Sequence, residues 1–151
     1  MTEIRYGIIG SGMMGQEHIR TLGLLEGVRV TAVCDPDEGM RTSAAFMVGP
    51  GCTEFTDHMA LVQSGLCDAL VIAAPNHLHF GILKDVLPAD LPILVEKPLC
   101  TTIADCEEVL RLARYRTAPV WVAMEYRYMP PVERLIEAVR SGETGPARMI
   151  S

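Results

Sequence analysis

A glycine-rich hexapeptide near the amino terminus constrains the fold of this chain more than any other feature. Gly10-Ser11-Gly12-Met13-Met14-Gly15 directly follows Ile4–Ile9, a mostly apolar segment that predicts a strand. Residues 13–25 then carry apolar side chains close to helical spacing, with polar residues between them. A strand, a G-x-G-x-x-G turn and a helix in this order predict the first unit of a parallel sheet.

The rest of the chain continues this alternation of short apolar runs and amphipathic stretches. Further strands are expected at Val28–Cys34, 54–56, 69–74, 92–96 and 120–124. Three helices are expected to begin at Pro36, after Asp57 as N-cap, and after the capping pair Thr102 and Asp105. Two more are expected over 79–87 and over 131–140, the last with Gly142 as C-cap. The predicted fold class is α/β, a doubly wound parallel sheet of the Rossmann type with helices on both faces.

Each glycine of the hexapeptide has its own physical task. Gly10 permits the tight turn out of the strand, and Gly15 lets the helix pack closely on the sheet. Gly12 lets the backbone approach a pyrophosphate, because no Cβ stands in the way. Phosphates would then bind the free N–H groups and the positive end of the helix dipole. The turn, with Met13 and Met14 at the helix start, predicts a dinucleotide site.

Asp35 ends the second expected strand, about 20 residues beyond Gly15, which is the spacing of a ribose-binding acid. A carboxylate there can accept hydrogen bonds from the adenosine ribose, and it repels a 2′-phosphate. The nearest arginine, Arg41, falls a turn or more into the next helix. The sequence therefore predicts NAD, with NADP less favoured. An alternative is that Asp35 serves only as the N-cap of the helix opened by Pro36.

A second candidate segment, Ala74-Pro75-Asn76, follows the fourth expected strand and leads to His79. Ligands bind doubly wound sheets at carboxyl strand ends beside the switch in strand order, so these four residues are candidate cofactor contacts. Asn76 and His79 could instead only cap and anchor the following helix. His77 and His79 lack a cysteine or carboxylate at ligand spacing, so no metal site is predicted.

The fifth expected strand ends in Glu96-Lys97-Pro98. A lysine at the active edge of the sheet, followed by a proline with restricted backbone, is placed to meet a substrate oxygen near the nicotinamide. The alternative is an ordinary exposed lysine that pairs with Glu96. The Lys97–Pro98 bond could also be cis.

Composition excludes several classes of partner. The formal net charge is −6, with 49% hydrophobic residues, which indicates a globular chain and argues against nucleic acid or an anionic membrane surface as partner. No apolar run approaches the roughly 18 residues of a membrane span, and the first residues do not resemble a secretion signal. The five cysteines form no C-x-x-C pair, so reduced thiols and a cytoplasmic location are expected.

Taken in order, these motifs resemble the Gfo/Idh/MocA family of NAD(P)-dependent oxidoreductases, the glucose–fructose oxidoreductase and inositol 2-dehydrogenase type. Residues Glu125-Tyr126-Arg127-Tyr128, after the sixth strand, are similar to an aromatic and basic segment of that family. The resemblance implies hydride transfer between nicotinamide and a sugar, polyol or related carbinol or carbonyl substrate. It implies that Lys97 is catalytic and polarises the reacting oxygen, that Glu96 holds Lys97, and that Tyr126 and Arg127 lie near the cofactor or substrate.

The resemblance also implies a division of the chain. Residues 1–125 are expected to form the dinucleotide-binding domain, and 126–151 a connecting helix and the start of a truncated α+β substrate domain, with a strand opening at 147–151. The general acid/base would belong to that domain, so none of the four histidines is assigned to it. A homo-oligomer is possible. A catalytically silent NAD-binding module that acts through protein association or redox sensing stays open as an alternative function.

Overall fold

The computed structural model describes residues 3–146, and within them six strands form one parallel sheet. The strand order is β3-β2-β1-β4-β5-β6. The chain adds β2 and β3 on one side of β1 and then crosses over, so that β4 pairs in parallel with the other side of β1. This order confirms the predicted doubly wound fold. The strand expected at 147–151 lies outside the described residues.

The elements alternate along the chain as the sequence predicts. The strands are β1 Ile4–Ile9, β2 Val28–Cys34, β3 Thr53–Phe55, β4 Ala69–Ile72, β5 Ile93–Val95 and β6 Val120–Val122. The α-helices are α1 Met13–Leu22, α2 Glu38–Val48, α3 His58–Gln63, α4 His79–Val86, α5 Ile103–Ala113 and α6 Pro130–Arg140. Three short 3₁₀ helices are η1 Asn76–Leu78, η2 Leu87–Ala89 and η3 Glu125–Tyr128.

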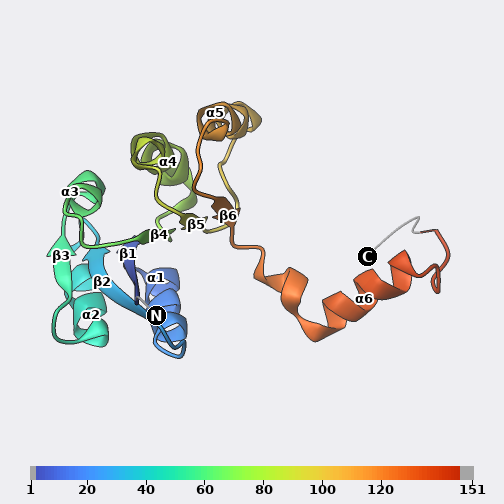
Figure 1. The fold of residues 1–151 in the computed structure, drawn as a ribbon, viewed down its shortest axis with the longest axis horizontal. Coiled ribbons are helices and arrows are strands. Elements are labelled where there is room, and N and C mark those ends of the chain that lie inside the picture. The colour runs from blue at the N-terminus through green and yellow to red at the C-terminus, as the bar shows by residue number, and fades with distance from the viewer. Residues whose placement is uncertain (1–2, 147–151) are drawn as a thin grey trace.

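Helices cover both faces of the sheet because neighbouring strand residues point to opposite sides (Figure 1). Ile8 packs with Ile19 of α1 and Ala44 of α2 on one face. Ile9, the next residue of β1, belongs to the cluster on the other face, which also contains residues of α3, α4 and α5. Two buried cores thus hold the central strands, and the carboxyl ends of the strands form one edge that is free to bind a ligand.

The first helical boundary that differs from prediction follows β2. Pro36 does not open the helix: α2 begins at Glu38, and the side chain of Asp37 caps it by accepting a hydrogen bond from the N–H of Met40. The proposal that Asp35 is this N-cap is therefore wrong. The predicted caps at Asp57 and Thr102 are confirmed, since both side chains accept from the backbone N–H three residues on.

Other boundaries shift by a few residues. The first helix ends at Leu22, not at residue 25, because the N–H groups of Leu24 and Leu25 donate to carbonyls three residues back, in turns that follow the C-cap Gly23. The strand expected at 69–74 stops at Ile72, and the third strand lies one residue earlier than predicted. Gly142 follows α6 with a φ of +79°, the left-handed conformation expected at a helix end.

The last helix, α6, extends away from the sheet beyond β6 (Figure 1). Among its apolar side chains only Ala138 is buried, whereas Leu135 and Val139 are exposed. No helix within residues 3–146 combines the length and apolarity needed to cross a membrane. All five cysteines are free thiols, as predicted.

Candidate functional site

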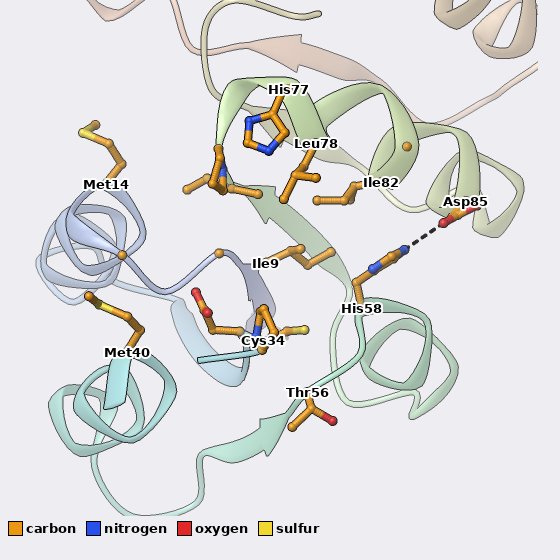
Figure 2. Close-up of a pocket in the computed structure, with 18 of the residues that line it drawn as sticks. Ile9, Met14, Cys34, Met40, Thr56, His58, His77, Leu78, Ile82 and Asp85 are labelled. Atoms are coloured by element: carbon orange, nitrogen blue, oxygen red, sulfur yellow. Dashed lines mark hydrogen bonds and ion pairs between the residues drawn. The ribbon is translucent and has the colours of Figure 1, made fainter. Parts of the chain in front are cut away.

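A cavity of about 730 Å³ lies at the carboxyl ends of β1, β2 and β4 (Figure 2). It brings together seven of the predicted cofactor residues, which come from three separate motifs: Gly10, Gly12, Met13, Met14, Asp35, Ala74 and Pro75. Its wall is mostly apolar, as in sites that bind small organic ligands. The sequence did not identify several further lining residues, among them Met40, Thr56, His58, Leu78, Ile82 and Asp85.

The glycine turn has the geometry that was expected of it. Gly10 has a φ of +91°, and a Cβ there would lie 2.4 Å from the backbone nitrogen of Ala74. A Cβ on Gly15 would lie 2.0 Å from the carbonyl oxygen of Gly10, so α1 packs directly on the turn. Any larger residue at these two positions would force the backbone to move.

Gly12 is different, because a Cβ there would come within 4 Å of no atom in residues 3–146 other than those of its chain neighbours. Its φ of −70° is open to any residue, so the fold itself does not require glycine here. Gly12 lines the cavity as the N-cap of α1, and within residues 3–146 no side-chain cap binds the first N–H groups of that helix. The open space beside uncapped N–H groups fits a phosphate group.

Asp35 is held in one orientation at the edge of the cavity. Its Oδ2 accepts from the backbone N–H of Ser11 at 2.7 Å, and its Oδ1 accepts from the N–H of Asp37 at 2.9 Å. Ser11 is fully buried, and the neighbouring N–H of Gly10 donates to the carbonyl of Cys34. The end of β2 and the glycine turn are therefore tied together, with an acidic group fixed between them.

Arg41, the first arginine that follows Asp35 in the sequence, is held by other partners. Its Nη1 donates to the backbone carbonyl of Asp35 at 2.8 Å, and its Nε lies 3.3 Å from Oε2 of Glu54. The side chain is mostly buried and is not one of the residues that line the cavity. Its charge is therefore balanced by Glu54 on β3.

His79 acts as an anchor of the loops that follow β4 and β5. The ring is fully buried, with Nδ1 2.8 Å from the carbonyl oxygen of Pro98 and Nε2 2.9 Å from that of Ala74. Both ring nitrogens thus face backbone carbonyls, and neither His79 nor Asn76 lines the cavity. This geometry favours the anchoring role over a direct cofactor contact.

The end of β5 carries a buried carboxylate and an exposed lysine. Glu96 is 6% exposed; its Oε1 lies 2.8 Å from Nε2 of His18, and its Oε2 accepts from the backbone N–H of Lys97 at 3.2 Å. Within residues 3–146 no ion pair joins the Lys97 side chain to Glu96, so the expected side-chain pairing is not found. The Lys97–Pro98 bond is cis, one of the two possibilities left by the sequence.

His18 was missed in the sequence because nothing in its neighbourhood on α1 suggests a partner on β5. Arg127 was predicted as a cofactor contact, but it lies in η3 and lines a separate surface hollow together with α6. The lining of the main cavity includes Gly12 and Asp35, but it does not include Gly15, Glu96 or Lys97.

A sheet in this order, with a glycine turn after β1 and an acid at the end of β2, defines a dinucleotide-binding Rossmann domain. Residues 4–124 match the family model described as "Oxidoreductase family, NAD-binding Rossmann fold". The chain belongs to this Gfo/Idh/MocA family, as its motifs indicated.

Named relatives are similar over nearly the whole chain. Inositol 2-dehydrogenase 1 of Saccharopolyspora erythraea is 34% identical over 94% of the chain, and rhizopine catabolism protein MocA of Rhizobium meliloti is 28% identical over all of it. The chain covers 43% and 47% of these two proteins, less than half of their length.

Among solved structures, myo-inositol dehydrogenase from Lactobacillus casei in complex with NAD(H) and myo-inositol has a TM-score of 0.88 and 26% identity, over 93% of this chain and 42% of that protein.

Proposed function

We propose that this chain binds NAD and forms the cofactor side of an oxidoreductase that transfers a hydride between nicotinamide and a sugar, polyol or related carbinol or carbonyl substrate. The observation that carries the proposal is that one cavity is lined by both Gly12 and Asp35. In this arrangement the pyrophosphate binds the N–H groups at the start of α1, where the absent Cβ of Gly12 leaves space.

The part of the site that would hold the adenosine ribose accounts for the expected preference for NAD over NADP. The carboxylate of Asp35 accepts hydrogen bonds from the adenosine ribose hydroxyls and repels a 2′-phosphate. Arg41 gives a 2′-phosphate little help, because its guanidinium is engaged by Glu54 and by the Asp35 carbonyl.

The chemistry takes place at the other end of the cofactor, near β5. When bound, NAD supplies the carbon that accepts or returns the hydride. Lys97 is exposed at the end of β5, and its ammonium donates a hydrogen bond to the reacting substrate oxygen. Glu96, fixed by His18, positions the backbone of Lys97. The complex of the Lactobacillus casei relative with NAD(H) and myo-inositol supports a polyol substrate.

We also propose that residues 126–151 connect the NAD-binding domain, 1–125, to a substrate domain of the full-length protein. The family match ends at residue 124, and the apolar face of α6 is exposed within residues 3–146. A cytoplasmic location of the complete enzyme is part of the same proposal, because free thiols persist in a reducing compartment.

Calorimetric titration of the chain with NAD and NADP tests the proposal. We expect NAD to bind more tightly, and Asp35→Ser to narrow the ratio of the two dissociation constants by about tenfold or more, which is roughly 1.4 kcal/mol. Failure to bind millimolar NAD would refute the site, and an unchanged ratio would refute the role of Asp35. Steady polyol oxidation by the full-length protein but not by its Lys97→Ala variant separates the enzyme from a silent NAD-binding module.

A further inference from the structure

One end of the cavity carries a histidine–carboxylate pair that the proposed function does not use. Nε2 of His58, the first residue of α3, lies 3.0 Å from Oδ2 of Asp85 near the end of α4. Both side chains line the same cavity as Gly12 and Asp35. Figure 2 shows the pair on the side of the pocket opposite Met14 and Met40.

The space beside this pair suits a flat heteroaromatic ring. Leu78 and Ile82 contribute apolar side chains to the wall, and Gly81 has no side chain. The base of a dinucleotide is bonded to the ribose that Asp35 is proposed to hold, so the base must occupy a neighbouring part of the cavity. Apolar walls can bind any base, whereas a few polar groups at the rim determine which base is preferred.

The polar groups of the pair are acceptors. When Nε2–H of His58 donates to Oδ2 of Asp85, Oδ1 of the carboxylate is left as an acceptor, and so is Nδ1 of the neutral ring. A rim of acceptors fits a donor on the base. Adenine has such a donor, the exocyclic amine at C6, whereas hypoxanthine has a carbonyl oxygen at the same position.

We therefore propose that the His58–Asp85 pair recognises the exocyclic amine of adenine and so selects NAD over dinucleotides with a 6-oxo base. Asp85 accepts the hydrogen bond from the amine, and His58 orients the carboxylate from α3. The inference rests on the proposed function, since it places NAD in the cavity.

The test compares NAD with nicotinamide hypoxanthine dinucleotide by calorimetry. The wild-type chain should prefer NAD by about tenfold or more, because a hydrogen bond to a charged group is among the stronger ones. Asp85→Ala should bring the two dissociation constants to within about twofold, and His58→Ala should reduce the preference as well.

Asp85→Asn provides a second variant of nearly the same shape. Because its amide can face either a donor or an acceptor, its preference for NAD over the hypoxanthine dinucleotide should also fall. Glu108→Ala is the matched control, since it breaks an ion pair with Arg111 on α5 and lies outside the cavity lining. Circular dichroism of each variant checks folding.

A wild-type chain that binds both dinucleotides equally well would overturn the inference while leaving the NAD site intact. An Asp85→Ala variant that keeps the wild-type preference would also overturn it. A chain that binds neither dinucleotide would refute the proposed function, and the inference with it.

Discussion

Nε2 of His18 lies 2.8 Å from Oε1 of Glu96, a contact between residues 78 positions apart. It connects α1, the helix that follows the glycine turn, to the end of β5, where Lys97 begins the next loop. Since the Glu96 carboxylate also accepts from the N–H of Lys97, the same group joins the helix proposed to bind the phosphates to the backbone of the proposed catalytic residue.

Loss of this contact should destabilise the fold. His18→Ala leaves the buried Glu96 carboxylate without its side-chain partner, and an unsatisfied buried polar group costs about 1–3 kcal/mol. Urea denaturation followed by circular dichroism measures the change. Arg20→Ala, which breaks an exposed pair with Glu17 on the same helix, should shift the free energy of unfolding by less than about 0.5 kcal/mol. Equal effects of the two variants would show that the His18–Glu96 contact adds no stability.

Alanine substitution at two glycines of the turn should change two different properties, the stability at Gly15 and the affinity for NAD at Gly12. Gly15→Ala places a methyl group 2.0 Å from the Gly10 carbonyl oxygen, so unfolding should become easier by about 1–3 kcal/mol. The added methyl group of Gly12→Ala meets no non-neighbouring atom of the described residues within 4 Å, so stability should change by less than about 1 kcal/mol. The methyl group would instead occupy the phosphate space and lower the affinity for NAD by at least about tenfold. Thermal unfolding and calorimetry read the two effects separately, and tight NAD binding by Gly12→Ala would argue against the phosphate position.

The Arg5–Asp68 pair should make stability depend on acid pH. Hydrogen bonds from the Arg5 side chain and backbone lower the pKa of Asp68 from 3.8 to about 2. A lowered pKa in the folded state stabilises the protein above pH 4, and this contribution is lost as the pH falls from about 4 to about 2.

Asp68→Asn should therefore lower the urea midpoint at pH 7 and have little effect near pH 2. A difference from wild type that stays constant over this range would contradict the assignment. Glu17→Gln, at an exposed pair, is the control and should change the midpoint little at either pH.

The thiol of Cys34 should be unreactive although it lines the cavity. Burial raises its pKa to about 12, so the nucleophilic thiolate is scarce at pH 8. Mass spectrometry after brief iodoacetamide treatment should find Cys34 unlabelled in the native chain and labelled in urea. Rapid labelling of the folded protein would mean that the thiol is more accessible than its 3% exposure indicates.

The sequence by itself determined the features that depend on local geometry. A positive φ at Gly10 and the close packing at Gly15 concern atoms of one strand-turn-helix unit, and the N-caps at Asp57 and Thr102 act over three residues. The continuous apolar run of β4 predicted a strand covered on both faces, because parallel strands in the middle of a sheet are buried on both sides.

Only the tertiary structure decided which side chains meet across elements. His58 and Asp85 come together because α3 and α4 pack on the same face of the sheet, and His18 reaches Glu96 because β1 and β4 place α1 near β5. His79 could not be assigned from its motif, since its role depends on two carbonyls that follow different strands. Even the start of α2 depended on competition between neighbouring carboxylates, in which Asp37 caps the helix while Asp35 holds the glycine turn. Local spacing sets backbone conformation, but contacts between side chains from distant segments depend on strand order and on how helices pack over the sheet.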